Sequence, residues 1–219
     1  MNKKFIADFT LLLVVFVWGS TFVIVQDAIS FLTPFSFNAI RFFIAFVILL
    51  SIYMIFTKKD KLHFTKDSIK SGFVIGTWLC FGYGFQTFGL LYTTPAKAGF
   101  ITGLSVVLVP LFSFLLLKYA LNRNIILGVI FTAAGLYMMT TMQTSSFSIG
   151  DFLVLLCAVS FAMHIIMTSK YAAKHHAMPL TILQIGVVSL LSFIGSLLFE
   201  EPSKMYRLDV LLQPEVVIG

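Results

Sequence analysis

Apolar residues in this chain gather in long runs, and short segments rich in charge, proline or small polar residues separate one run from the next. About 20 apolar residues, rising 1.5 Å each along a helix, cross the hydrocarbon core of a bilayer. Runs of that order predict seven spanning helices, over residues 9–25, 35–56, 71–92, 99–117, 125–141, 152–169 and 180–199. The pattern therefore predicts an all-α polytopic membrane protein.

Composition excludes a soluble domain. Hydrophobic residues make up 59% of the chain and charged residues 11%, whereas soluble domains carry about 25% charged residues. The run 9–25 is longer than a signal-peptide core of about 7 to 15 residues, and no small-residue cleavage pattern follows it, so we expect a spanning helix. Cys80 and Cys157 lie inside apolar runs, which favours packing over a disulfide.

Basic residues are concentrated in alternate connections. Eleven lie at the amino end or after the second, fourth and sixth runs: Lys3, Lys4, Lys58, Lys59, Lys61, Lys66, Lys70, Lys118, Arg123, Lys170 and Lys174. The other connections carry three: Lys97, Lys204 and Arg207. The positive-inside rule then predicts a protein of the cell (cytoplasmic) membrane with a cytoplasmic amino terminus and, after seven spans, an external Gly219. The +6 charge is thus expected to reflect orientation in a lipid bilayer, and no nucleic-acid partner is expected.

The shortest connection joins the third and fourth runs. Pro95 ends the third helix there, because proline has no N–H donor and forces Thr94 out of the helical region. Gly99 and Gly103 follow with a GxxxG spacing that lets helix backbones approach closely in lipid. Gly72 and Gly76 repeat the spacing in the third run, so these four glycines are predicted to be helix-packing positions.

Three features make the chain resemble the EamA-type permeases of the drug/metabolite transporter superfamily. They are the segment 86–104 with Pro110 after it, the Trp-Gly-Ser-Thr-Phe motif at 18–22, and Arg41-Phe42 in the second run. The resemblance implies a bundle of ten transmembrane helices, built as two inverted five-helix repeats, that moves small metabolites across the cytoplasmic membrane. We expect an exporter of small polar metabolites such as amino acids, working by alternating access, with no cofactor and no enzymatic activity.

A weak internal repeat agrees with that architecture. An Asp-Phe pair opens both the first and the sixth run, at 8–9 and 151–152, and a proline opens the next run in each copy. Five spans separate the copies, so they have opposite orientations across the bilayer. We interpret 1–145 as a first five-helix repeat and 146–219 as an incomplete second one, with two helices and an external tail. Truncation of a longer permease is the favoured explanation; an unusual seven-span protein is the alternative.

Polar side chains inside the spans are functional candidates, because they are costly in lipid. Arg41 lies about two turns inside the second run, and Asn38 precedes it by one turn on the same face. An unpaired charge at that depth costs at least ~2.5 kcal/mol. Arg41 therefore either belongs to the substrate path or reaches the outer headgroups and ties helices together.

Further candidates lie in four other runs. Trp18 and Thr21 occupy the middle of the first run, Tyr83 and Gln86 a glycine-rich part of the third, and Thr102 the fourth. These side chains are predicted to line or gate a cavity together with Arg41. Helix packing is the alternative for the first run, with its hydroxyl groups bonding back to their own helix.

His164 is the one candidate in the sixth run. It occupies roughly the repeat-equivalent place of Thr21 and is the only group of the set that titrates near neutral pH. It is a candidate for proton coupling, with a satisfied packing role as the alternative.

Two other function classes stay open. Small-residue faces serve a membrane assembly or scaffold protein equally well. An intramembrane hydrolase would need the acidic pair Glu200-Glu201 to meet the histidine pair His175-His176, but the topology puts the pairs on opposite sides, so no single metal site is expected. The oligomeric state is not indicated.

Overall fold

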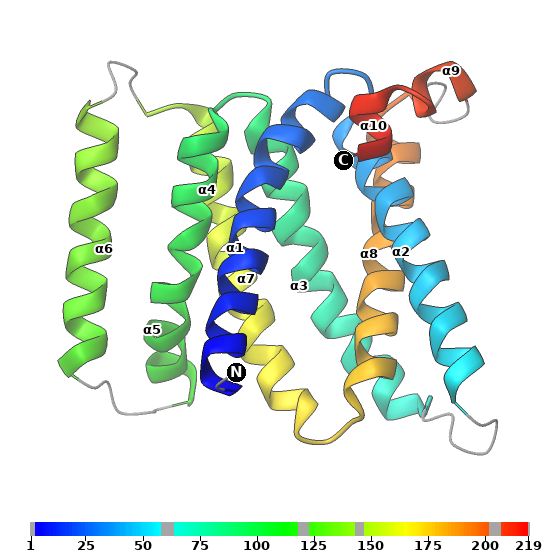
Figure 1. Ribbon diagram of the computed structural model, residues 1–219, viewed down its shortest axis with the longest axis horizontal. Helices are drawn as coiled ribbons and strands as arrows, with labels where there is room; N and C mark the ends of the chain where they lie inside the picture. The colour runs from blue at the N-terminus through cyan, green and yellow to red at the C-terminus, as the bar shows by residue number, and fades with distance from the viewer. Residues whose placement is uncertain (1–2, 58–63, 118–122, 143–146, 202–206, 219) are drawn as a thin grey trace.

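The computed structural model describes residues 3–57, 64–117, 123–142, 147–201 and 207–218. Within those residues the protein is all-helical (Figure 1). The helices are α1 (Lys3–Ala28), α2 (Pro34–Phe56), α3 (Lys66–Leu90), α4 (Pro95–Gly103), α5 (Ser105–Leu117), α6 (Arg123–Met142), α7 (Ile149–Ala172), α8 (Ala177–Phe199), α9 (Leu208–Leu211) and α10 (Pro214–Ile218). Because α4 and α5 form one interrupted rod, seven sizeable helical segments result in the described chain, which confirms the predicted fold class.

Five of these segments are long and apolar enough to cross a membrane: Phe5–Ala28, Pro34–Phe56, Pro95–Leu116, Ile149–Ala172 and Ala177–Phe199. In α6 the apolar stretch is shorter, Arg123–Gly135. Helix α3 has the length of a span, but its first turns carry Lys66, Asp67 and Lys70.

Local sequence explains where the helices begin. Both α2 and α4 start at a proline that follows a threonine N-cap, a position where the missing N–H costs nothing. Capping boxes open α3, through Thr65 and Ser68, and α7, through Ser148 and Asp151. Each box satisfies backbone N–H groups that have no partner inside the helix.

The predicted fourth span differs from the structure in two ways. It begins at Pro95, four residues before the expected start, and it is interrupted at Leu104. There the Leu104 N–H donates to the Ile101 carbonyl at 3.0 Å, an i to i−3 bond that tightens the backbone. Gly103, which packs against nothing, precedes this break.

Helix α3 is packed closely against α7 and α8. A Cβ added to Gly72 would lie 2.5 Å from Leu183 of α8, and one added to Gly76 would lie 2.6 Å from Val187. The expectation for the second glycine pair needs correction: a Cβ on Gly99 would meet only Phe22, at 3.7 Å, and one on Gly103 would meet nothing within 4 Å. The close glycine contacts of α3 are made with α8 and also with α7, since a Cβ added to Gly82 would lie 2.5 Å from Phe161 and one added to Gly89 would lie 2.5 Å from Val154.

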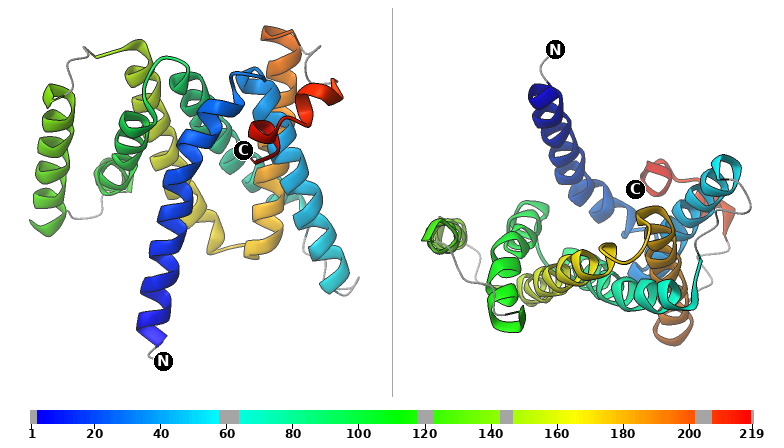
Figure 2. Two further views of the ribbon diagram at one scale, coloured as in Figure 1. Left: turned by 45° about the horizontal axis from the view of Figure 1, so that its top comes forward. Right: turned by 90° about the horizontal axis from the view of Figure 1, so that it is seen from below.

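Helix α1 leans away from the other helices toward its amino end, as both views of Figure 2 show. Its residues 5–19 are exposed, whereas Phe22, Val25 and Ala28 join a buried cluster with Leu32. Residues of α9 and α10 pack against this cluster at the carboxyl end of α1. Helix α6 lies at the edge of the bundle (Figure 1).

The chain passes up and down, so alternate connections lie at the same end of the molecule (Figure 1). Lys66, Lys70, Arg123 and Lys170 lie toward the end that carries the amino terminus. Several residues of the charge pattern lie outside the described residues: Lys58, Lys59, Lys61, Lys118, Lys204 and Gly219.

Candidate functional site

A cavity of about 260 Å³ lies between α1, α2 and α3. Its lining comprises Trp18, Thr21, Phe22, Val25, Arg41, Phe42, Ala45, Tyr83, Gln86 and Leu90. Five of the eight predicted substrate-path residues are in this set. They come from three helices that are neighbours in sequence, and the polar side chains among them provide groups that orient a solute in an otherwise apolar pocket.

Arg41 is enclosed by aromatic rings. Its guanidinium carbon lies 5.0 Å from the ring centroid of Phe37, 4.9 Å from that of Phe42 and 5.1 Å from that of Tyr83. Rings at this distance attract the cation through their quadrupoles. The aromatic side chains therefore hold the guanidinium beside the cavity.

Asn38 lies next to Arg41 and fixes its orientation. The Asn38 Oδ1 accepts a hydrogen bond from Arg41 Nη2 at 3.1 Å. Its Nδ2 donates to Thr87 Oγ1 at 3.0 Å, and that hydroxyl donates to the Tyr83 carbonyl at 2.7 Å. Asn38 is 1% exposed, so it is a buried link between α2 and α3 and does not line the cavity.

Two donors of the lining have no acceptor among the residues that the structure describes. They are Arg41 Nε and Gln86 Nε2, both of them buried nitrogen atoms. A buried donor without an acceptor costs about 1 to 3 kcal/mol, and more when it is charged. Such groups are rare in folded proteins, and each calls for an explanation.

Thr21 lines the cavity and also bonds back to its own helix, which were the two alternatives for the first run. Its hydroxyl donates to the Trp18 carbonyl at 2.6 Å, which is the bond back to its own helix. Both side chains nevertheless line the cavity.

Thr102 and His164 lie elsewhere, and this corrects their expected place. The Thr102 side chain is buried against α7, where its hydroxyl lies 3.9 Å from Cys157 Sγ. His164 Nε2 lies 2.8 Å from Gln184 Oε1 of α8. The reason is rotation about the helix axis: α4 and α7 turn these positions toward α7 and α8, away from α1.

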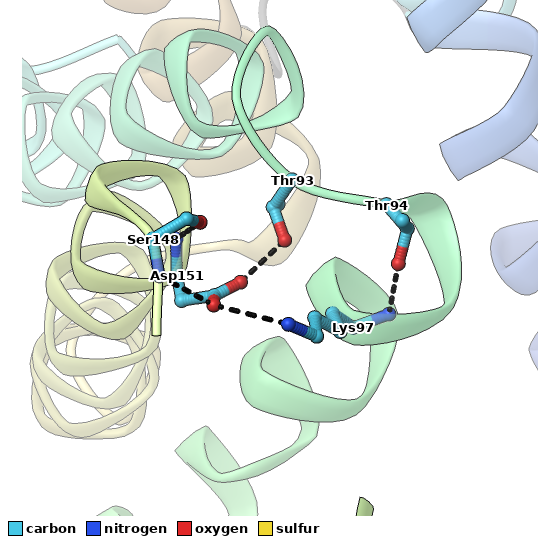
Figure 3. A network of polar contacts seen from close by, with 5 residues as sticks. All are labelled: Thr93, Thr94, Lys97, Ser148 and Asp151. Carbon is cyan, nitrogen blue, oxygen red and sulfur yellow. Dashed lines mark hydrogen bonds and ion pairs between the residues drawn. The ribbon is translucent and has the colours of Figure 1, made fainter. Parts of the chain in front are cut away.

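A second polar site joins the α3–α4 hairpin to the start of α7 (Figure 3). Lys97 Nζ lies 3.5 Å from Asp151 Oδ2, and the two side chains are 5% and 0% exposed. Thr93 donates to the other carboxylate oxygen, and the Ser148 N–H donates to Oδ2 at 2.9 Å. The charge pattern predicts that Lys97 lies in an external connection. The structure corrects this prediction, because Lys97 lies in α4 and is buried.

Glu200 has a structural role that sequence reasoning missed. Its Oε1 accepts from the Phe35 N–H at 2.8 Å, and its Oε2 accepts from the Ser36 N–H at 3.0 Å. Thr33 adds a third bond, at 2.6 Å. The carboxylate therefore caps the amino end of α2, where an anion is favoured.

The histidines lie far from Glu200. His175 Nε2 lies 3.1 Å from Ser71 Oγ and 3.3 Å from Asp67 Oδ2, at the other end of α8. In the described part of the chain, no group of three His, Cys, Asp or Glu side chains has a geometry that could hold a metal ion.

A larger cavity, of about 660 Å³, lies between α2 and α8. Its lining is almost wholly apolar, and the hydroxyl of Ser189 is already bonded to the Ala39 carbonyl at 3.1 Å. This groove offers little to orient a polar solute, so the smaller cavity beside Arg41 is the candidate site.

Comparison with known proteins gives consistent matches. The sequence pattern that defines the EamA-like transporter family matches residues 5–141 of this chain. The chain is 39% identical over 191 residues to an uncharacterized transporter of Archaeoglobus fulgidus, covering 87% of this chain and 58% of that protein. It is 26% identical over 201 residues to the uncharacterized transporter YyaM of Bacillus subtilis, covering 88% of this chain and 65% of that one. The chain thus spans about three fifths of the length of these relatives.

One solved crystal structure has a related arrangement of helices. It aligns with a TM-score of 0.54 at 17% identity, covering 85% of this chain and 69% of the other. At this identity the match concerns the fold alone.

Proposed function

The chain belongs to the EamA-like transporter family, and from that premise we propose that it exports small polar metabolites, such as amino acids, across the cell membrane. The observation that carries this proposal is the cavity beside Arg41, where polar side chains from α1, α2 and α3 meet. A scaffold role does not explain why a cation lies beside a cavity. Ionisable side chains inside membrane spans are costly and mark substrate and ion paths, which favours a transporter.

The mechanism we propose is alternating access between two inverted repeats. The family match over 5–141 supports a first repeat over 1–145, with 146–219 as part of a second. The close contact of α3 with α7 and α8 supports an interface between these two proposed units. Rocking at such an interface is how inverted-repeat carriers expose a site to each side in turn.

The orientation in the membrane is also a proposal. The basic residues at one end of the bundle support a cytoplasmic amino terminus. Proton coupling through His164 is not included in the proposal, because its imidazole is hydrogen-bonded to Gln184 and is not part of the cavity lining.

Transport by the natural gene product in proteoliposomes tests the proposal. We expect saturable counterflow of a radiolabelled small amino acid or organic acid, and at least a tenfold loss in Arg41→Ala and Gln86→Ala. Gly84→Ala is the matched control, since an added Cβ there meets nothing within 4 Å. Normal transport by both cavity variants contradicts the site, and no transport above that of protein-free liposomes contradicts the function.

A further inference from the structure

We propose that the cavity beside Arg41 selects organic monocarboxylates with an apolar body, the carboxylate binding to Arg41 and Gln86. This inference rests on the proposed transport function and favours monocarboxylates over zwitterionic amino acids as its substrate class. It draws on three features of the cavity: the donors without acceptors, the net charge and the apolar walls.

The donors call for an acceptor-rich ligand. A guanidinium has five N–H donors and no acceptor, and Asn38 accepts from one of those of Arg41. Within the described part of the chain, Arg41 Nε and Gln86 Nε2 have no hydrogen-bond partner, although both residues line the cavity and Gln86 is 6% exposed. A carboxylate offers two oxygens with about four lone-pair positions, and it matches the planar fork of an arginine.

The charge of the site favours an anion. Among the described residues that line the cavity, Arg41 is the one charged side chain, and no Asp or Glu accompanies it. Glu215 lies in α10 and is not part of the lining. A cation without a counterion is costly in a poorly hydrated interior, and an anionic ligand neutralises it. One arginine suits one carboxylate, whereas a phosphate dianion would keep an excess negative charge.

The remaining walls define the rest of the ligand. Trp18, Phe22, Val25, Phe42 and Leu90 present apolar surface to the cavity. A ring or branched chain attached to the carboxylate would bury its surface there. A zwitterionic amino acid brings an ammonium group that finds no carboxylate in this lining, so we expect it to bind more weakly than a monoanion of similar size.

Fluorescence of Trp18 gives a direct binding test. The chain has two tryptophans, and Trp78 is not part of the cavity lining but lies near Phe81, at 6.3 Å between ring centroids. Trp78→Phe therefore leaves Trp18 as the only indole reporter. Protein in lipid nanodiscs is titrated with benzoate, with its neutral isostere benzamide, and with phenylalanine.

We expect a saturable fluorescence change with benzoate, binding at least tenfold weaker for benzamide, and intermediate binding for phenylalanine. Arg41→Gln in the same background should weaken benzoate binding at least tenfold. Lys174→Gln removes an exposed cation far from the cavity and should leave binding unchanged.

Equal binding of benzamide and benzoate by the unmutated cavity overturns the substrate class, whether or not Arg41→Gln folds. So does the absence of any benzoate binding, or benzoate binding that survives Arg41→Gln. The transport assay separates these failures from failure of the proposed function: counterflow of another solute that is lost in Arg41→Ala would keep the function and reject the carboxylate.

Discussion

Two cations inside the described part of the helical bundle, the buried Lys97 and the partly buried Arg41, have different surroundings. Lys97 is paired with Asp151, and Thr93 and Ser148 donate to the same carboxylate (Figure 3). Arg41 has an amide oxygen and aromatic rings around it, but no carboxylate in the cavity lining and one nitrogen without an acceptor. The Lys97 charge is thus neutralised by Asp151. The Arg41 charge has no carboxylate partner in the cavity lining, and we propose that a bound ligand neutralises it.

This difference is the basis of our proposal that Lys97 has a structural role and Arg41 a functional one. A paired buried ion adds little net stability over apolar residues, but breaking the pair is strongly destabilising. An ion whose partner is missing can be removed at low cost to the fold. We therefore expect Lys97 and Asp151 to be essential for folding and Arg41 to be essential for binding.

The largest expected loss of stability comes from breaking the ion pair between Lys97 and Asp151. Asp151→Ala should reduce the free energy of unfolding by about 3 to 5 kcal/mol, because it leaves the Lys97 charge buried. Unfolding in detergent, followed by tryptophan fluorescence, measures the loss. The double variant Lys97→Met/Asp151→Leu should recover most of it, and a double variant as unstable as the single one would show that the charges are not the cause.

A smaller loss is expected from overpacking the contact between α3 and α8, which involves neither cation. Gly76→Ala places a Cβ 2.6 Å from Val187 and 2.8 Å from the Gln184 carbonyl, and overpacking of this kind costs about 1 to 3 kcal/mol. Gly84→Ala, eight positions along the same helix, meets nothing and should not destabilise. Equal unfolding midpoints for the two variants would show that α3 is free to move away from α8.

Asn38→Asp would give Arg41 a carboxylate partner within the protein. The new carboxylate would lie where Asn38 Oδ1 now accepts from Arg41 Nη2 at 3.1 Å, so it competes with a ligand for the guanidinium. Benzoate binding should weaken about tenfold, equivalent to about 1.4 kcal/mol, without loss of folded protein. Asn38→Leu is the control that removes the amide without adding charge, and equal benzoate affinities for the Asp and Leu variants would contradict this account.

The smallest expected effect concerns a third charge, also neutralised within the fold. Glu200→Gln keeps part of the cap on α2 but loses its charge, so stability should fall by about 1 kcal/mol. The exposed neighbour Glu201 provides the control, since Glu201→Gln should have no measurable effect on the unfolding midpoint.

Hydropathy was sufficient to predict the seven helical segments, because the thickness of the bilayer core sets how many apolar residues a spanning helix needs. It also identified Arg41, Tyr83 and Gln86 as polar residues in apolar runs, and these do meet at one cavity. Thr102 and His164 had the same signature but face α7 and α8. The rotation of each helix about its axis depends on tertiary packing, which the pattern does not contain.

The two internal charge sites were missed for a related reason. Lys97 follows a helix-breaking proline, as many exposed loop cations do, and its partner lies 54 positions away. Glu200 lies at the end of α8, and its bonds to residues of the α2 amino end cross more than 160 positions. In hindsight, the Ser-x-x-Asp capping pattern at 148–151 marked the helix start that holds Asp151.

The most direct test replaces each of the two cations by methionine and compares thermal unfolding of the two variants in the same detergent. Lys97→Met leaves the Asp151 carboxylate without its cation, and a loss of about 3 to 5 kcal/mol would lower the unfolding temperature by roughly 6 to 20 °C. Arg41→Met removes an unpartnered donor and should stay within roughly 4 °C of the unmutated protein, a change of about 1 kcal/mol. Equal losses, or a larger loss for Arg41→Met, would contradict the division into one structural and one functional cation.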